Sequence, residues 1–247
     1  MSLEWAKNKI MAHCDWAKSI ILTGSQATGE STSSSDIDFI AIVEGTSSGE
    51  RIRRSISKRS TKGNRPLVDV KVYTEEEFRK AKSGKEHLFL WTALTTGQTL
   101  CGEDLTQDIT LNKRRVVNTV WEELHEVVDC VDMLEMRAHF TGCCFALYQA
   151  LATTYFVQKF VLDQSKHPSK LGFMTDMLGD AHDLVKDRYY YVASRTEKSE
   201  LAQDVGIPTS VDRKFSEADY SVVRQKCEEA VRYLRQNYSK VAEWAES

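Results

Sequence analysis

A short apolar segment that ends in Gly-Ser, followed after ten further residues by Asp-Ile-Asp, constrains this chain more than any other feature. Residues 19–22 read Ser-Ile-Ile-Leu and predict a buried strand, after which Gly24 and Ser25 form a turn. Side chains two positions apart in a strand share a face, so we expect Asp36 and Asp38 to project together. The pattern therefore predicts two neighbouring carboxylates close to a glycine turn.

The two aspartates repel each other, so they are costly to bury unless a cation neutralises them or one of them takes a proton. Mg²⁺ accepts carboxylate and nucleotide phosphate oxygens in one octahedral shell, which would turn the repulsive pair into a binding site. Gly24 lets a phosphate approach the backbone closely, and Ser25 adds a hydroxyl donor. The segment thus predicts a site for one or two Mg²⁺ ions and a nucleotide.

A third carboxylate lies on a later predicted strand, residues 67–73, in which apolar and polar side chains alternate. The valines share one face of this strand, whereas Asp69 and Lys71 lie on the other. If the strand lies beside the one that carries Asp36 and Asp38, Asp69 joins the same cluster. Three carboxylates can hold two metal ions, or hold one ion while Asp69 accepts a proton from an attacking hydroxyl, and both alternatives stay open.

Gly24-Ser25, Asp36-Ile37-Asp38 and Asp69 together resemble the motif of the DNA-polymerase-β-like nucleotidyltransferase superfamily, particularly its minimal and kanamycin-nucleotidyltransferase-like branches. The resemblance covers roughly residues 18–105. It implies transfer of a nucleoside monophosphate, AMP from ATP or the equivalent from another nucleoside triphosphate, to a hydroxyl acceptor, with release of pyrophosphate. By the same resemblance, Gly24 and Ser25 would hold the triphosphate and Asp36 and Asp38 the metal ions. Asp69 would be the third metal ligand or the general base.

The chain departs from the minimal branch at two positions. That branch often has Arg directly after Gly-Ser and again two residues later, where this chain has Gln26 and Thr28. Two positive charges that would face the phosphates are therefore missing from the sequence. An alternative hypothesis follows, namely a protein that binds nucleotide without catalysing transfer.

Composition is typical of an ordinary soluble enzyme. A chain of 247 residues with 41% hydrophobic residues can bury the core of one large domain or two small ones. It contains no run of eighteen apolar residues and no basic segment followed by an apolar one at its start, so we expect no membrane span, no secretory signal and a cytoplasmic location. The six cysteines form no CxxC pair, so structural zinc is not expected; Cys143 and Cys144 are predicted to be buried thiols.

The chain divides near residue 106, with strands and helices alternating before it and a helical pattern throughout after it. The predicted fold is α/β (α+β): a nucleotidyltransferase catalytic domain over 1–105, with a small mixed sheet and flanking helices, and a bundle of α-helices over 106–247. Capping boxes or caps are predicted at Thr74 and Ser216. Apolar periodicity predicts helices over residues 3–17, 86–96, 117–134, 139–162 and 170–195, and from 216 to beyond 241.

The helical half resembles, in pattern and length only, the bundles of kanamycin-nucleotidyltransferase-like and HEPN-associated proteins. No Arg here has a His at the spacing of HEPN ribonucleases, so RNA cleavage is not expected. Lys170 resembles a bundle lysine that reaches the nucleotide phosphates in kanamycin-type enzymes, although a surface lysine beside a turn explains it equally well. The same relatives imply a homodimer. The bundle would bind substrate or a second subunit.

Two charged segments bear on the acceptor. Residues 51–65 contain seven basic residues and no acid, which suits either RNA or the solvated face of a helix; the net charge of −3 disfavours nucleic acid. Residues 122–135 are rich in acidic side chains. These could bind an aminoglycoside-like polycation, or they could simply form the solvent-facing surface of a helix. A second alternative is an antitoxin-like or regulatory module that transfers AMP to a partner protein or binds it. Acceptor and base preference stay open.

Overall fold

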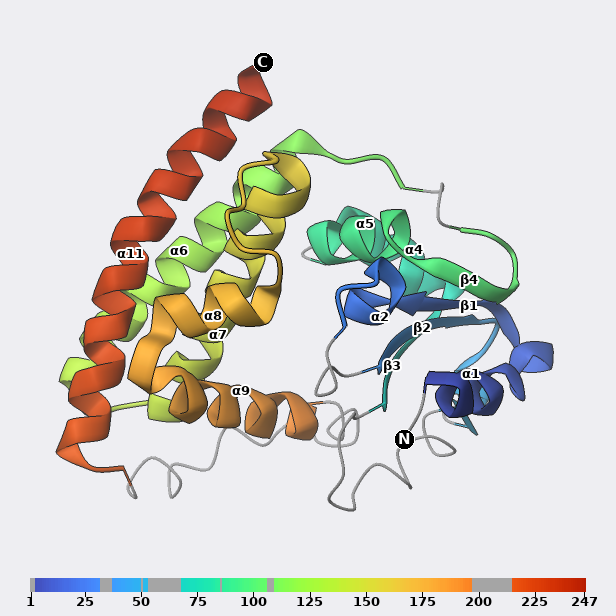
Figure 1. The fold of residues 1–247 in the computed structure, drawn as a ribbon, viewed down its shortest axis with the longest axis horizontal. Helices are drawn as coiled ribbons and strands as arrows, with labels where there is room; N and C mark the ends of the chain where they lie inside the picture. Colours follow the sequence, from blue (N-terminus) through green and yellow to red (C-terminus); the bar gives the residue numbers. More distant parts are fainter. Residues whose placement is uncertain are drawn as a thin grey trace. The chain divides into compact units, whose positions relative to one another are not determined.

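The chain folds into two compact units, Met1–Arg115 and Val116–Ser247 (Figure 1). The first holds a small mixed sheet with flanking helices, and the second is helical, as the predicted fold class requires. This computed structural model describes residues 3–31, 37–49, 51–52, 68–84, 86–105, 109–196 and 215–247.

The sheet of the N-terminal unit has four strands in the order β3-β2-β1-β4. Strand β1 pairs antiparallel with both β2 and β4, whereas β2 pairs parallel with β3. The sheet is therefore mixed, and β1 and β2 are its central strands. The strands are β1 (Ala17–Thr23), β2 (Ile37–Val43), β3 (Val68–Thr74) and β4 (Gln98–Gly102).

Helices cover both faces of this sheet. Helix α1 (Leu3–Met11) packs its buried Ala6 and Ile10 on one face, in a cluster that includes Phe39 of β2. Helices α4 (Glu75–Ser83) and α5 (His87–Thr95) pack on the other. The side chains of β2 therefore alternate between two apolar layers, which accounts for its nearly continuous burial.

The predicted first helix is too long. It ends at Met11, and a 3-10 turn at Cys14–Trp16 leads into β1, which begins at Ala17. Cys14 and Ala17 nevertheless pack against the α1 side of the core, so their helical spacing coincided with burial that has a different origin. A disulfide joins Cys14 to Cys101 of β4, a link that the sequence did not predict.

The C-terminal unit follows the predicted helices except in one place. The expected single helix over 170–195 is broken by a 3-10 turn at Gly179–Ala181, where Gly179 has a φ of +52° that L side chains rarely adopt. The Ser216 cap is confirmed, since its Oγ accepts from the backbone of Asp219 at 3.2 Å. The helices are α6 (Lys113–Glu135), α7 (Phe140–Phe156), α8 (Lys170–Leu178), α9 (His182–Thr196) and α11 (Glu217–Glu246).

Helix α7 is the central helix of this core. With the π-helical turn Val157–Val161 that continues it, it is long and apolar enough to cross a membrane, but most of this segment is buried inside the protein. Its side chains join those of α6, α8, α9 and α11 in one cluster. The apolar composition is therefore that of a core helix.

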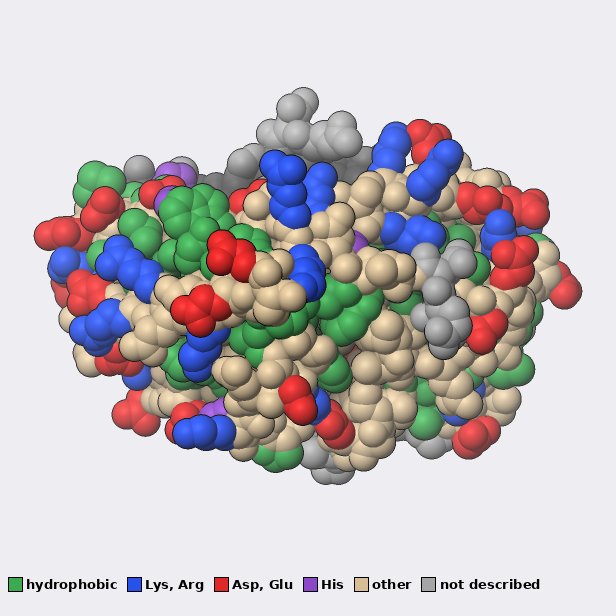
Figure 2. Space-filling model, turned by 90° about the horizontal axis from the view of Figure 1, so that it is seen from above, with side chains coloured by type: hydrophobic (Ala, Val, Ile, Leu, Met, Phe, Trp, Pro, Cys, Tyr) green, Lys and Arg blue, Asp and Glu red, His purple; other side chains and the backbone are tan. Residues whose placement is uncertain are grey.

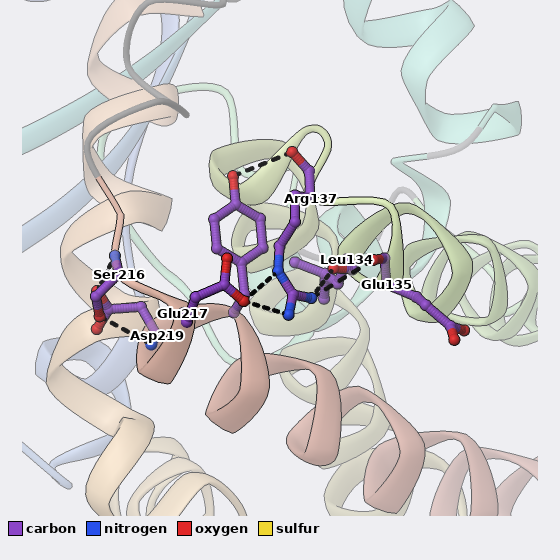
Figure 3. Close-up of polar contacts among 7 residues, drawn as sticks. Leu134, Glu135, Arg137, Ser216, Glu217 and Asp219 are labelled. Atoms are coloured by element: carbon purple, nitrogen blue, oxygen red, sulfur yellow. Dashed lines mark hydrogen bonds and ion pairs between the residues drawn. The ribbon is translucent and has the colours of Figure 1, made fainter.

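A clamp holds the turn between α6 and α7 to the start of α11 (Figure 3). The side chain of Arg137 donates to the Leu134 carbonyl at 3.1 Å and pairs with Glu217, while its own carbonyl accepts from Tyr220 at 3.4 Å. Arg137 has a φ of +57°, so its contacts compensate for an unfavourable backbone. This clamp is structural.

Four cysteines of the C-terminal unit are free and buried: Cys130, Cys143, Cys144 and Cys227. The prediction of buried thiols at Cys143 and Cys144 is confirmed. A hydrogen bond with Cys130 and burial raise the pKa of Cys143, and burial raises the pKa of Cys227. These groups therefore stay protonated at neutral pH.

Candidate active site

Asp38 lies in the middle of a row that crosses three strands. It pairs with Thr23 of β1 on one side and with Asp69 of β3 on the other. Paired positions on neighbouring strands are about 4.8 Å apart and share a face. The structure therefore brings Asp38 and Asp69 together beside the end of β1, whereas Asp36 lies outside the described residues.

The row lies at the open end of the face that α4 and α5 cover. Ile40 and Ile42 follow Asp38 along the same face of β2 and belong to the apolar cluster under these helices. Asp38 itself is half-buried and Asp69 is exposed. The two carboxylates thus lie at the edge of a packed apolar layer, where they remain accessible to a ligand.

Gly24 touches Asp38 so closely that no side chain fits there. It follows Thr23 directly with a φ of +66°, and a Cβ added to it would lie 2.5 Å from Asp38 Oδ2. Gly24 also begins the short helix α2 (Gly24–Thr28), in whose first turn Ser25 is half-buried. The Gly-Ser turn and the Asp38 carboxylate are therefore in direct contact.

A charged network beside Asp69 was not recognised from the sequence. Lys71, on the same face of β3, pairs with Glu86 Oε1 at 2.8 Å, and Tyr73 donates to Glu86 Oε2 at 2.6 Å. Burial, with the Glu86 hydrogen bond, raises the pKa of Tyr73. Strand alternation predicts that Lys71 lies on this face, and Tyr73 follows it two positions later. Their partner Glu86 comes just before α5, and no local pattern in the sequence identifies it.

Lys170 belongs to the C-terminal unit and begins α8. Its side chain is exposed, and Nζ lies 5.8 Å from the centre of the Phe156 ring. Ser169 caps the helix by accepting from the Gly172 backbone at 3.1 Å. Lys170 is therefore exposed to solvent at a capped helix start.

The oxygen-rich site fits a hard cation. Carboxylate oxygens are the ligands that Mg²⁺ prefers, and Asp38 and Asp69 supply them from paired positions of β2 and β3. In the described part of the chain, no group of three His, Cys, Asp or Glu residues lies close enough to hold a metal ion. Asp36, which was predicted to hold the metal ions together with Asp38, lies outside that part.

Residues 9–89 match the family model of the nucleotidyltransferase domain. The match spans about a third of the chain and contains the Gly-Ser turn and all three aspartates. The N-terminal unit therefore carries the domain of a nucleotidyltransferase enzyme, which transfers nucleoside monophosphates. The match ends before the helical half, whose likeness to HEPN proteins stays a prediction.

One solved structure that is similar to this chain is spectinomycin adenyltransferase AAD(9) from Enterococcus faecialis, determined with ATP and spectinomycin. The two share 10% identity over 92% of this chain and 100% of that chain, with a TM-score of 0.44. That score is too low to carry over the other protein's substrates. No curated protein sequence matches this chain.

Proposed function

We propose that this protein is a Mg²⁺-dependent nucleotidyltransferase that moves a nucleoside monophosphate, AMP from ATP, to a hydroxyl of an acceptor and releases pyrophosphate. The observation that carries the proposal is the row of Thr23, Asp38 and Asp69 with Gly24 against Asp38. This row puts two carboxylates beside a glycine turn that a phosphate can approach closely, within a segment that matches the nucleotidyltransferase domain.

Each residue then has a defined task. Gly24 and Ser25 hold the triphosphate through backbone and hydroxyl donors. Asp36, Asp38 and Asp69 would hold Mg²⁺, which when bound stabilises negative charge on the phosphates. The acceptor oxygen forms a bond to the α-phosphorus, the bond from that phosphorus to pyrophosphate breaks, and Asp69 takes the hydroxyl proton if it acts as the base.

Labelled ATP tests this proposal. Protein incubated with α-labelled ATP and MgCl₂ should transfer label to one fraction of a panel of aminoglycosides, RNAs and lysate proteins. Asp38→Asn should reduce transfer by at least about a hundredfold because it removes a charged oxygen ligand. The matched control Asp187→Asn, at an exposed position of α9, should not change it.

Retention of most transfer by Asp38→Asn would contradict the assignment. ATP binding without transfer to any member of the panel would favour the non-catalytic alternative.

The acceptor is proposed to be a hydroxylated small molecule of the aminoglycoside kind. On α6, the residues Glu122, Glu126, Asp129, Asp132 and Glu135 are exposed. On the face shown in Figure 2, acidic and basic side chains are interspersed, which gives little support to a nucleic-acid acceptor. Label on protein in the panel would instead favour the partner-modifying alternative. A homodimer and a cytoplasmic location belong to the same proposal.

A further inference from the structure

The row of Thr23, Asp38 and Asp69 has two ends, and the proposed reaction assigns one of them to the nucleotide. The Gly-Ser turn that would hold the triphosphate follows Thr23, at the β1 end of the row. In phosphoryl transfer the attacking and leaving oxygens lie roughly in line, on opposite sides of the phosphorus. The acceptor hydroxyl should therefore approach from the β3 end, beyond Asp69.

The next side chain on this face of β3 belongs to Lys71. It lies two positions after Asp69, about 6.6 Å along the strand, and β3 is the outermost strand on this side of the described sheet. Its Nζ lies 2.8 Å from Glu86 Oε1 and 4.7 Å from the centre of the Phe89 ring. An ammonium group, a carboxylate and an aromatic ring therefore lie together on the acceptor side of Asp69.

These three side chains are accessible to a ligand. Phe89 is 39% exposed, although its neighbours Leu88 and Leu90 on α5 are buried. The side chains of Lys71 and Glu86 are 42% and 40% exposed. The group thus offers an apolar face beside hydrogen-bond donors and acceptors, which is the combination that small-molecule sites use.

The Glu86 carboxylate is held in place before any ligand binds. Its Oε2 accepts from the hydroxyl of buried Tyr73 at 2.6 Å. The next residue, His87, is buried as well: its Nε2 accepts from the Asn112 backbone at 2.8 Å, and its Nδ1 lies 2.6 Å from the Lys82 carbonyl oxygen. A carboxylate can accept about four hydrogen bonds, so Glu86 can accept further ones from a ligand at a low entropic cost.

We propose that Glu86, Lys71 and Phe89 form the acceptor subsite, which binds a polyhydroxylated ring such as a sugar or a cyclitol. Phe89 packs against the C–H face of the ring, Glu86 accepts from one ring hydroxyl, and Lys71 donates to another. The charges of Lys71 and Glu86 balance, so the subsite recognises hydroxyl groups rather than net charge. All three residues belong to the N-terminal unit. The inference rests on the proposed function, in which Asp69 faces the acceptor.

Steady-state transfer from α-labelled ATP by the full-length protein, with kanamycin and streptomycin as probe acceptors, tests the inference. Phe89→Ala should raise KM for the probe by about tenfold, because it removes the apolar face. Glu86→Gln keeps the shape but loses the charge, and it should also raise this KM by about tenfold. In both variants kcat and KM for ATP should stay within about twofold of wild type, because only acceptor binding is weakened.

Trp16→Ala and Glu76→Gln are the matched controls in the same unit. Trp16 is an exposed ring just before β1, at the end of that strand opposite Gly24. Glu76 is an exposed carboxylate of α4 that also pairs with a lysine, Lys80. Neither control should change KM for the probe or for ATP.

An unchanged KM for the probe in both variants, or an equal rise in KM for ATP, would overturn the inference. If the wild type labels neither probe but labels another fraction of the panel, and Asp38→Asn abolishes that labelling, only this inference fails. If the wild type labels no fraction at all, the proposed function fails with it.

Discussion

The two units of this protein differ in how their chemistry is encoded. In the N-terminal unit, the candidate site occupies one row across three strands, so the relation between Thr23, Asp38 and Asp69 follows from strand register. In the C-terminal unit, the core is a helical cluster in which four free cysteines and many aromatic rings serve packing. The family match stops at residue 89, within the first unit.

This difference shows that a sequence motif indicates a site most directly when strand pairing fixes the positions of its residues. A shift of one residue in β2 would turn Asp38 into the opposite apolar layer, so the site tolerates no slippage. A helical bundle can exchange apolar residues more freely as long as its volume is filled. Mutations in the N-terminal unit should therefore change nucleotidyl transfer, whereas mutations in the C-terminal unit should mainly change stability.

Gly24→Ala should produce the largest effect. The added Cβ would meet Asp38 Oδ2 at 2.5 Å at a φ of +66°, so we expect at least about a hundredfold loss of nucleotidyl transfer. Gly29→Ala is the control. The φ of Gly29, +75°, is equally unfavourable for an L side chain, but nothing lies within 4 Å of a Cβ added there. It should cost about 1 kcal/mol of stability and little activity. Equal loss in both variants would show that backbone strain alone is responsible.

Core truncation should act on one unit at a time. Phe39→Ala in β2 and Phe140→Ala in α7 should each lower the free energy of unfolding of their own unit by about 3–5 kcal/mol. Phe39 neighbours Asp38, so its truncation should also reduce transfer. Hydrogen exchange resolved along the chain measures the loss of stability in each unit, and the labelled-ATP assay measures transfer. Faster exchange in β1 to β3 of the Phe140 variant would contradict separate units.

Reduction should affect the N-terminal unit alone. The Cys14–Cys101 disulfide closes a long loop, with a sequence separation of 87, so a reductant should lower the stability of this unit by about 2–4 kcal/mol. The described cysteines of the C-terminal unit are free and should show no change. Denaturant unfolding with and without reductant measures the difference. The Cys14→Ser variant should no longer respond, and a response there would point to another thiol.

The two capping boxes should give the smallest and most similar effects. Thr74→Ala at α4 and Ser216→Ala at α11 should each cost about 1 kcal/mol, measured by denaturant unfolding. Hydrogen bonds from Ser216 hold the pKa of Asp219 below its usual value. The contribution of the ionised Asp219 is therefore full above about pH 4 and is lost as the pH falls through the lowered pKa. Ser239→Ala, at an exposed site within α11, should change stability little.

Periodicity predicted the helices better than the exact buried positions. In α11 the apolar residues that recur at helical spacing are buried, as the periodicity of this segment predicts: Val223, Cys227, Val231, Leu234 and Val241. In α6 four residues of the apolar stripe are buried as the spacing predicts, namely Val120, Leu124, Val127 and Leu134. At its other two positions, Val117 and Val131 are half-buried and their neighbours Val116 and Cys130 are buried instead. One helical position is 100° of rotation, so neighbouring apolar residues compete for the core, and tertiary packing decides between them.

Local chemistry explains what could be read without a structure. Strand alternation, the Thr74 and Ser216 caps and the Gly-Ser turn depend on neighbours within a few residues, so the linear order of amino acids specifies them. The same local reading failed at Gly179, where a helical pattern continues through a break. It also extended the first helix to Ala17, which begins β1.

Long-range pairing settled the rest. The contact of Gly24 with Asp38, the pairing of Asp38 with Asp69, the Glu86 partner of Lys71 and the Cys14–Cys101 bond all join residues that are distant in sequence. Such contacts depend on how the sheet assembles, and no short-range pattern records that order. The amino-acid sequence alone thus identified the residues of the candidate site. The folded sheet brought Asp69 beside Asp38, and Asp38 against Gly24.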